Sequence, residues 1–309
     1  MSTITSAYTE ALAAAKLVAG SQHYPQSTLY VVATPIGNLA DISLRALYLL
    51  GLADTVACED TRHTGQLLHA YGLHKPLMAL HEHNESEAAQ NVIAKLQAGE
   101  RVVYVSDAGT PAISDPGSRL VAAAVTAGMR VVPLPGASSV TTVLSAAGCV
   151  NTSGFVFIGF LPSKGADRAA VFKQVEGADR AVVVLEAPHR IETLIKELSS
   201  LGERRVTVGR ELTKQFESIV TMQAAELPAW LAAKADNARG EFALVVHPKA
   251  IQDAVSSSAD DTVMTTATAL LTRLLQELPL KTAVQVAMDV SGMPKNSLYD
   301  QALKLKDAS

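Results

Sequence analysis

The sequence has few cysteines, no excess of positive charge and no long apolar run, and each shortage excludes a class of protein. Cys58 and Cys149 are the only cysteines among 309 residues, which excludes a disulfide framework and a zinc site built on paired cysteines. The net charge of −4 excludes a chain that coats nucleic acid by bulk charge. We therefore expect a cytoplasmic protein in which any nucleic-acid site is local.

No apolar run approaches the roughly 18 residues of a membrane span, so we expect no contact with a membrane. Residues 11–20 resemble the core of a signal peptide, but Lys16 interrupts them and no basic residue precedes them. We expect residues 1–27 to form a mobile extension or a short surface helix.

The length and composition fit two folded domains with a tail. Apolar residues make up 48% of the chain, which is enough for full hydrophobic cores, and the 18% of charged residues argues against a disordered chain. A chain of 309 residues is too long for one average domain.

Alternating patterns in the first half predict an α/β domain over residues 28–150. Short apolar runs indicate buried parallel strands at residues 29–33, 55–58, 101–105 and 130–134. Helical periods lie between them, such as Leu44, Leu47 and Tyr48. Strands spaced by helices indicate βαβ units, and therefore a parallel sheet.

A turn at residues 151–154, Asn-Thr-Ser-Gly, marks the expected boundary to a second α/β domain over residues 151–249. Its strands are predicted at residues 155–158, 181–185, 205–208, 218–222 and 242–246. Its helices are predicted at residues 169–174, 191–198 and 229–235. Because the strands outnumber the helices, we expect this sheet to be mixed.

Residues 250–309 are predicted to form a linker and a helical tail. Residues 256–261 are small and polar, which is typical of a linker. Three apolar stripes with helical spacing follow, within residues 270–278, 283–290 and 298–303.

The first predicted strand ends in residues 33–38, Ala-Thr-Pro-Ile-Gly-Asn. Ligands of open α/β sheets bind at the carboxyl ends of strands. Gly37 stands without the glycine triplet of a dinucleotide site, and no Gly-Lys-Ser/Thr follows as in a P-loop. Taken alone, this segment is best interpreted as a tight turn.

The long loop at residues 106–117, Ser-Asp-Ala-Gly-Thr-Pro-Ala-Ile-Ser-Asp-Pro-Gly, is the strongest local signal. Small residues, two prolines and two glycines follow a strand directly, so backbone N–H and C=O groups are exposed at close range. The alternative is a rigid turn in which Asp115 caps the next helix. Because the loop is longer than a turn requires, we favour a ligand site.

A third loop at a strand end covers residues 135–139, Pro-Gly-Ala-Ser-Ser. Its alternative is ordinary helix capping by Ser138 or Ser139. Three such loops on one edge of one sheet support a ligand site more strongly than any one of them alone.

Residues 58–64 and 81–85 add polar groups at the same predicted edge. His81, Glu82 and His83 suggest a metal, but residues that alternate along a strand point apart, and no third group of ligands follows. We therefore expect no metal, and we expect these polar side chains to form a hydrogen-bonding wall along this edge of the sheet. Glu59, Asp60 and Arg62 are interpreted as an ion-pair network or a substrate clamp.

In the second half, residues 186–190 and 209–217 end two strands with basic side chains. Arginine and lysine at such ends suit phosphate contacts, which predicts a role for Arg190 and Lys214. The alternative is that both side chains are solvated charges on surface turns without a function. Residues 161–164, Leu-Pro-Ser-Lys, are a weaker candidate for phosphate contacts at the same edge of the sheet.

In this order and spacing, these blocks resemble the tetrapyrrole methylase (class III methyltransferase) superfamily over about residues 29–248. The resemblance implies two αβα domains with S-adenosylmethionine in the cleft between them, usually in a homodimer. The first loop lacks the glycine-rich sequence of the small-molecule branch, which favours the RNA branch. That branch implies 2′-O-methylation of a cytidine in the decoding centre of 16S rRNA, with the 30S subunit as the expected partner.

Carried over by position, the resemblance assigns cofactor contacts to Pro35, Ile36, Thr110, Ile113, Ser138, Ser139, Ala187, Leu212 and Ala243. Ala187 stands where the RNA branch often has serine, so its side chain is not expected to do chemistry. The strand-end loops assign the catalytic environment to Glu59, Asp60, Arg210, Glu211 and Lys214. Substrate contacts are assigned to Arg62, His189, Arg190 and Lys295.

Two alternatives to this function stay open, as do two roles for the tail. The chain could instead be a porphyrin or corrin methylase, or a non-enzymatic RNA-binding assembly factor. The last two predicted helices resemble a helix-turn-helix around residues 291–292, with Lys295, Asn296 and Ser297 placed to touch RNA phosphates. Because this segment is not basic, we favour a helical bundle that packs on the catalytic domains or on a partner subunit.

Overall fold

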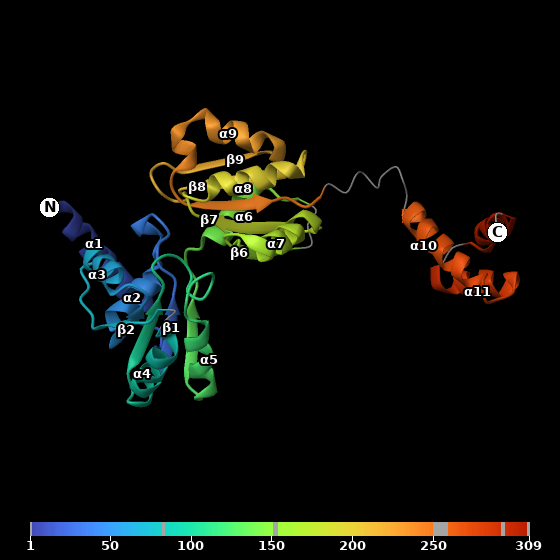
Figure 1. Ribbon diagram of the computed structural model, residues 1–309. Coiled ribbons are helices and arrows are strands. Elements are labelled where there is room, and N and C mark those ends of the chain that lie inside the picture. Colours follow the sequence, from blue (N-terminus) through green and yellow to red (C-terminus); the bar gives the residue numbers. More distant parts are fainter. Residues whose placement is uncertain (1, 82–83, 151–153, 250–258, 292–293, 308–309) are drawn as a thin grey trace. The chain divides into compact units, whose positions relative to one another are not determined.

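The computed structural model describes residues 2–81, 84–150, 154–249, 259–291 and 294–307 (Figure 1). The chain divides into two compact units, residues 1–249 and 250–309. The first unit contains two five-stranded sheets, and the described residues of the second form helices α10 to α12. The predicted class, an α/β protein with two αβα sheets and a helical C-terminal segment, is therefore confirmed.

The first sheet is parallel throughout and has the strand order β3-β2-β4-β1-β5. The four predicted strands are present as β1 (Thr28–Val32), β2 (Thr55–Cys58), β4 (Arg101–Val105) and β5 (Arg130–Leu134). Strand β3 (Leu77–Ala79), an edge strand of three residues, was not predicted. A strand this short carries too little alternation to be recognised.

Helices cover both faces of this sheet. In β4, Val103 and Val105 pack with the buried residues of α2 (Leu44–Leu52) and α3 (Thr61–Ala70). The alternate residues Val102 and Tyr104 pack with α4 (Glu85–Gln97) and α5 (Ser118–Thr126). This alternation along one strand makes a three-layer αβα arrangement.

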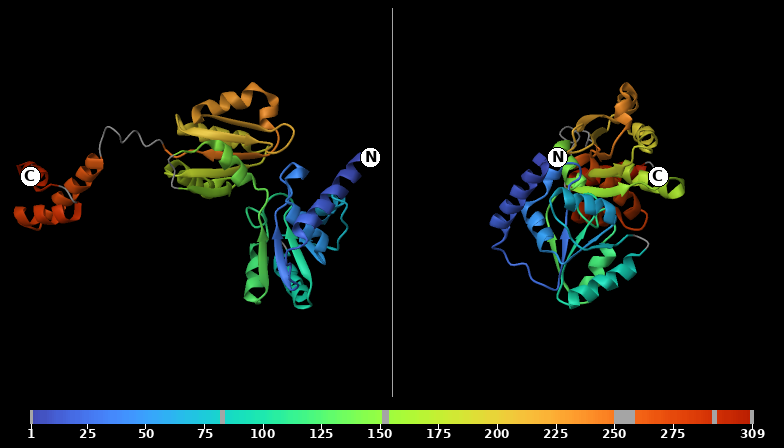
Figure 2. Two further views of the ribbon diagram at one scale, coloured as in Figure 1. Left: turned by 180° about the vertical axis from the view of Figure 1, so that it is seen from behind. Right: turned by 90° about the vertical axis from the view of Figure 1, so that its left-hand side faces the viewer.

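The N-terminal segment forms α1 (Ser2–Ala19), which lies alongside α2 (Figure 2). Ala15 is buried against Leu47 of α2 and Tyr71 at the end of α3. The expected surface helix is present, and the alternative of an extension without a helix is wrong. A short 3-10 helix, η1 (Leu39–Asp41), follows β1.

The second sheet has the order β6-β7-β10-β8-β9. Its strands are β6 (Phe155–Phe160), β7 (Ala181–Glu186), β8 (Arg205–Arg210), β9 (Ser218–Gln223) and β10 (Phe242–Val246). Strands β6 and β7 are parallel and the other neighbours are antiparallel, so the prediction of a mixed sheet is confirmed.

Helices α7 (Gly165–Gly177), α8 (Ile191–Leu198) and α9 (Leu227–Ala233) contribute to the core on one face of the second sheet. The opposite face is covered by α6 (Ser139–Ala147), whose Val140, Val143 and Ala147 pack on Val183 and Val245. Three further 3-10 helices are η2 (Ser199–Leu201), η3 (Ala224–Glu226) and η4 (Ala235–Ala238). Helix α6 follows β5 directly, so it links the loops of the first sheet to the core of the second.

The second unit has its own apolar core. Helices α10 (Ala259–Leu274), α11 (Leu280–Ser291) and α12 (Lys295–Asp307) bury Leu271, Val284 and Leu298 together. The three predicted tail helices are confirmed. The linker predicted at residues 256–261 is wrong at its end, because α10 begins at Ala259.

Three sequence predictions fall partly or wholly outside the described residues. They are the turn at residues 151–153, the linker at residues 256–258, and Gly292 in the predicted turn between the last two helices. Ser291, the other residue of that turn, is the last residue of α11. Among the described residues, no helix is both long enough and apolar enough to span a membrane.

Candidate active site

The loops that follow β1, β4 and β5 meet at one edge of the parallel sheet, because these three strands are neighbours. Thr34 and Gly109 exchange two backbone hydrogen bonds of 2.9 and 3.0 Å. The Thr34 hydroxyl also donates to the Ser106 carbonyl at 3.1 Å. The first loop is therefore bound directly to the long loop, as expected from parallel strands that end together.

The third loop fits closely against the other two. The Thr110 hydroxyl donates to the Ala137 carbonyl at 3.0 Å. A Cβ on Gly136 would lie 2.8 Å from the Ala33 Cβ, closer than such atoms approach one another. Glycine at this position is therefore what allows the first and third loops to touch.

The long loop holds a strained backbone. Ala112 and Ser114 have φ of 66° and 64°, a region that side-chain-bearing residues rarely adopt. Such residues persist where the surrounding structure enforces them, and they cluster at ligand sites. This strain supports the interpretation of residues 106–117 as a ligand loop rather than a simple turn.

The proposed alternative role of Asp115 as a helix cap is wrong. The N-cap of α5 is Gly117, with φ of 121°. The N–H groups of Gly117 and Arg119 donate to the buried Glu85 Oε1 at 3.0 and 3.1 Å, so a carboxylate from α4 caps α5. Burial, followed by the charge of Glu59, raises the pKa of Asp115 to about 6.

Two close contacts join these loops to the mixed sheet. A Cβ on Gly37 would lie 2.4 Å from Lys214 Cγ and 2.9 Å from the Leu212 carbonyl oxygen. A Cβ on Gly159, in β6, would lie 2.7 Å from the Ser114 hydroxyl. The first and long loops therefore rest on β6 and on the loop that follows β8.

A pocket of about 310 Å³ is formed where Ile36 of the first loop and Ser139 at the start of α6 meet the carboxyl end of β7 and the start of β10. Five of the nine predicted cofactor residues line it: Ile36, Ser139, Ala187, Leu212 and Ala243. Pro35, Thr110, Ile113 and Ser138 are not among its lining residues. The remaining lining residues were not predicted as cofactor contacts, and they are Phe160, Leu185, Glu186, Pro188, Glu241 and Phe242.

Ser138 and Ser139 do not cap α6 with their side chains as the alternative interpretation expected. Ser138 is the N-cap and has extended backbone, but its side chain makes no capping hydrogen bond. Ser139, the first residue of α6, lines the pocket instead. The start of α6 is therefore open toward the pocket at a residue with a hydroxyl group.

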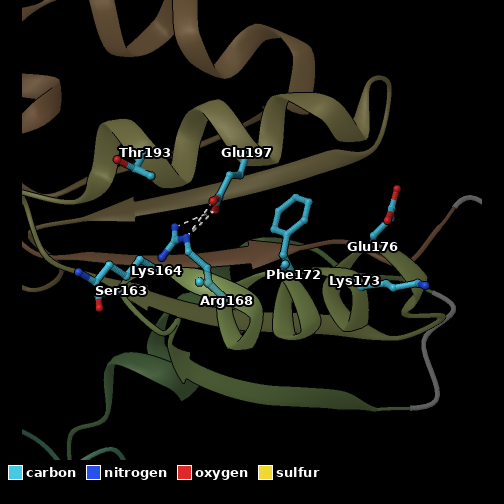
Figure 3. A pocket seen from close by; sticks show the side chains of 10 residues that line it. Ser163, Lys164, Arg168, Phe172, Lys173, Glu176, Thr193 and Glu197 are labelled. Carbon is cyan, nitrogen blue, oxygen red and sulfur yellow. Dashed lines mark hydrogen bonds and ion pairs between the residues drawn. The ribbon is translucent and has the colours of Figure 1, made fainter.

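A larger hollow of about 540 Å³ lies on the other face of the mixed sheet, between α7 and α8 (Figure 3). Its central Arg168 is satisfied internally, since the guanidinium donates to the Glu197 carboxylate and to the Pro162 carbonyl. Ser163 and Lys164, from the weaker candidate segment at residues 161–164, line it, but none of the assigned catalytic, cofactor or substrate residues does. We therefore place the candidate site at the smaller pocket, where the loops of both sheets meet.

An ionic group borders this pocket. Lys214 Nζ donates to Glu211 Oε1 at 2.9 Å and to Glu241 Oε2 at 3.0 Å. Burial opposes the charge on Lys214, but the two carboxylates outweigh burial and hold its pKa above the usual value. Burial also opposes the charge on Glu211, but hydrogen bonds from Lys214 and the Glu241 N–H outweigh it and lower the pKa of Glu211.

The backbone of this group is strained as well, with φ of 51° at Glu211 and 64° at Thr213. Arg210 Nη2 donates to the Phe216 carbonyl at 3.0 Å. Arg210, Glu211 and Lys214 thus lie together, as the sequence predicted. Strained backbone on both the long loop and this loop is the signal that separates them from ordinary turns.

Glu59, Asp60 and Arg62 follow β2, on the other sheet. Asp60 is the N-cap of α3, and its carboxylate accepts from the Arg62 N–H at 2.8 Å and from Arg62 Nη2 at 2.9 Å. The Arg62 side chain and N–H together lower the pKa of Asp60 to about 2. These contacts match the ion-pair alternative, while Arg62, with 87% of its side chain exposed, stays accessible to a substrate.

The remaining predicted substrate residues are dispersed. Arg190 forms an ion pair with Glu186 at 3.2 Å and donates to the Leu161 carbonyl, so it ties β6 to β7 rather than standing free. Its neighbour His189 is exposed. Lys295 is exposed at the first residue of α12, in the second unit.

The hydrogen-bonding wall predicted at residues 81–85 is organised differently. Residues 81–83 were predicted to alternate along a strand, but strand β3 ends at Ala79, so this prediction is wrong. Asn84 Oδ1 accepts from the His81 N–H at 2.8 Å, and Glu85 begins α4, while Glu82 and His83 lie outside the described residues. Among the described residues, no group of three His, Cys, Asp or Glu side chains is arranged to hold a metal ion.

Comparison with known proteins places this geometry in a family. Residues 28–228 match the family model "Tetrapyrrole (Corrin/Porphyrin) Methylases", and residues 262–306 match "RsmI C-terminal HTH domain". The chain is similar to the cobalt precorrin-4 methyltransferase CbiF, a cobalamin biosynthetic enzyme of known structure. The TM-score is 0.54, with 18% identity over 71% of this chain and 95% of that one.

Sequence similarity is much higher to relatives named ribosomal RNA small subunit methyltransferase I. The relative from Pseudomonas aeruginosa is 44% identical over 284 residues, which cover 91% of this chain and 99% of the relative. The relative from Escherichia coli O157:H7 is 43% identical and covers 90% of this chain and 96% of the relative. The chain therefore belongs to the tetrapyrrole methylase family and, within it, to the family of ribosomal RNA small subunit methyltransferase I.

Proposed function

We propose that this chain transfers a methyl group from S-adenosylmethionine to a ribose 2′-hydroxyl of small-subunit ribosomal RNA. The observation that carries the proposal is the pocket in which Ile36 and Ser139 meet Ala187, Leu212 and Ala243. The names of relatives with about 44% identity support a ribosomal RNA substrate. A tetrapyrrole is named only by the broader family model and by solved structures such as CbiF, which is 18% identical.

The residues of the pocket fit this cofactor. Ile36, Phe160, Leu212 and Phe242 provide apolar walls for the nucleoside, and Ser139 and Glu241 provide hydrogen-bonding groups. Ligand sites of this kind are mostly apolar with a few convergent polar groups. When bound, S-adenosylmethionine supplies a methyl group on a cationic sulfur, and no metal or covalent intermediate is required.

Positioning supplies much of the rate of an in-line methyl transfer. The chain must also stabilise a ribose hydroxyl that gains negative charge as it attacks and loses its proton. We assign this environment to Glu59, Asp60, Arg210, Glu211 and Lys214. Within it, Lys214 is best suited to stabilise the oxygen, because its ammonium is held by Glu211 and by Glu241, and Glu241 lines the pocket.

The proton requires an acceptor with a pKa near the working pH. Asp60 is a poor one, since its pKa is about 2. The Glu59 carboxylate lies close enough to Asp115 to help raise the pKa of Asp115 to about 6, so this pair provides a better acceptor. Asp115 lies between Ile113 and Gly117, within the predicted ligand loop.

Substitution of each of the five assigned residues by alanine tests the catalytic assignment. Methyl transfer and cofactor affinity are measured separately for each variant. We expect Lys214→Ala to lower the transfer rate on the order of 100-fold while the cofactor affinity changes by less than about 3-fold. Retained transfer in all five variants would refute the assignment.

We further propose that the substrate is the assembled 30S subunit, that the target is a cytidine of the decoding centre, and that the chain acts as a homodimer in the cytoplasm. Tritiated methyl transfer to 30S subunits that lack native methylation, to naked 16S rRNA and to a free tetrapyrrole distinguishes the substrates. Label on a base, or label on the tetrapyrrole alone, would overturn the proposal, and light scattering measures the oligomeric state.

A further inference from the structure

Phe216 presents an aromatic side chain to solvent from residues 211–217, the loop that joins β8 to β9. It is 69% exposed, which makes it the most exposed of the six phenylalanines, all of which the structure describes. Single apolar side chains at the surface are common. What distinguishes Phe216 is the loop that holds it and the site beside which that loop lies.

Hydrogen bonds fix the backbone on both sides of this ring. The Phe216 carbonyl accepts from Arg210 Nη2 at 3.0 Å. The next residue, Glu217, donates its N–H to the Lys214 carbonyl at 3.1 Å, and its carboxylate accepts from the Thr213 N–H at 2.7 Å. A ring held on such a loop is ordered before a ligand arrives, so contact with it costs little conformational entropy.

The same loop borders the candidate active site. Leu212 lines the pocket, and Lys214 donates to Glu241 on the pocket wall. Phe216 follows Lys214 by two residues, which span at most about 7 Å of chain. Phe216 itself is not among the lining residues, so a cofactor in the pocket leaves its ring uncovered.

An exposed ring at this position suits a single-stranded nucleic acid. Proteins recognise RNA mostly at unpaired bases, which stack on aromatic side chains. Stacking tolerates any sequence, because every base has a flat face. The net charge of −4 means that bulk attraction to phosphates cannot supply the affinity, so local contacts of this kind have to contribute.

We propose that Phe216 stacks on an unpaired base of the substrate RNA, beside the ribose that receives the methyl group. The inference rests on the proposed methylation of ribosomal RNA and adds a residue that binds the substrate. Phe216 is a positioning residue: its ring holds the strand next to Lys214, and the chemistry belongs to the neighbouring groups.

The test compares Phe216→Leu, which keeps an apolar side chain without a flat ring, with Phe216→Trp, which keeps the ring. Methyl transfer to 30S subunits that lack native methylation gives KM and kcat for each variant. We expect the KM for the subunit to rise on the order of 10-fold in Phe216→Leu and to stay within about 2-fold of wild type in Phe216→Trp. The affinity for S-adenosylhomocysteine, measured by calorimetry, should be unchanged in both.

Phe155→Leu is the matched control, because Phe155 is also exposed but lies at the amino end of β6, whereas Phe160 at the other end lines the pocket. Its KM should equal that of wild type.

A wild-type KM in Phe216→Leu overturns the inference. So does an equal rise in Phe216→Leu and Phe216→Trp, or a loss of cofactor affinity as large as the rise in KM, which would show a role in folding the loop. A changed oligomeric state of Phe216→Leu in light scattering would make Phe216 a contact between copies of the chain and would also overturn it. If the wild-type chain transfers no methyl group to the ribose of the subunit, the proposed function itself fails, and the inference fails with it.

Discussion

Gly37 and Lys214 lie in contact across the two sheets: a Cβ on Gly37 would stand 2.4 Å from Lys214 Cγ. The same Cβ would be 2.9 Å from the Leu212 carbonyl oxygen and from the Thr213 hydroxyl. Because no side chain intervenes, Ile36 and Leu212 can line one pocket from different sheets. The single glycine that rules out a dinucleotide fingerprint thus has a packing role here.

Gly37→Ala is therefore expected to damage the pocket. The Lys214 side chain can move aside, but the Leu212 carbonyl belongs to the backbone, so the two loops must separate. We predict that the affinity for S-adenosylhomocysteine falls on the order of 10-fold or more, since small displacements of positioning groups have large effects. Calorimetric titration measures the change.

Gly177→Ala is the control for this substitution, because nothing lies within 4 Å of a Cβ built there, at the end of α7. Its affinity and its free energy of unfolding should stay close to the wild-type values. Equal affinity in Gly37→Ala and Gly177→Ala would contradict the packing role of Gly37.

Arg190→Met tests whether this arginine holds the fold or binds RNA. Removing the guanidinium leaves the Glu186 carboxylate buried without its ion-pair partner. Breaking such a pair lowers the free energy of unfolding by about 3 kcal/mol. Denaturant unfolding measures this loss. An unchanged stability combined with weaker binding of the ribosomal subunit would instead support the direct substrate role.

The sequence predicts the fold largely because hydrophobic periodicity is a local property. All nine strands predicted from apolar runs are present, and the mixed character of the second sheet follows from its small number of helices. Strand β3 was missed because three residues at a sheet edge show no clear alternation. Helix α1 is longer than the short helix that was predicted. It packs through Ala15 against Leu47 and Tyr71, and such tertiary contacts cannot be read from the local sequence.

The candidate site is predictable only in part, since it depends on contacts between distant segments. The loops after β1, β4 and β5 carry recognisable turn residues and adjoin as expected. In contrast, nothing in the sequence indicates that Glu85, 32 residues before Gly117, caps α5 in place of Asp115. The exposure of Phe216 is likewise visible only when the whole loop is folded.

Asp115→Asn is expected to change how stability depends on pH. The Asp115 carboxyl titrates at about 6 in the folded chain against an ordinary value of 3.8. Between these values the folded state binds more protons than the unfolded state, so this carboxyl lowers stability as the pH rises through that range. The asparagine variant removes this effect and should therefore be more stable than wild type at pH 7. The gain in the free energy of unfolding should be about 1 kcal/mol, less than the full pKa shift implies, because solvent screens this half-buried group.

Unfolding of both proteins by urea between pH 4 and pH 7 provides the comparison. The difference between them should be small near pH 4, grow up to about pH 6 and then level off. A difference that is constant across this range would show that the carboxyl of Asp115 is not perturbed in the folded chain.

Deletion of residues 250–309 tests the role of the helical tail. This unit has its own core and matches a helix-turn-helix domain of the family. We predict that the truncated chain binds S-adenosylhomocysteine with wild-type affinity and binds the small ribosomal subunit at least about 10-fold more weakly. Calorimetry and subunit co-sedimentation measure the two affinities. Equal loss of both would indicate instead that the tail packs on the catalytic domains.

The most direct test of this account asks which pocket binds the cofactor. S-adenosylmethionine is titrated into the wild-type chain and into two variants that fill one pocket each. Ala187→Leu fills the pocket between the loops of the two sheets, and Ala169→Leu fills the hollow beside α7 (Figure 3). We predict one equivalent bound by the wild type and by Ala169→Leu, and an affinity reduced on the order of 100-fold in Ala187→Leu. Unchanged binding in Ala187→Leu, or no binding by the wild type, would contradict the account.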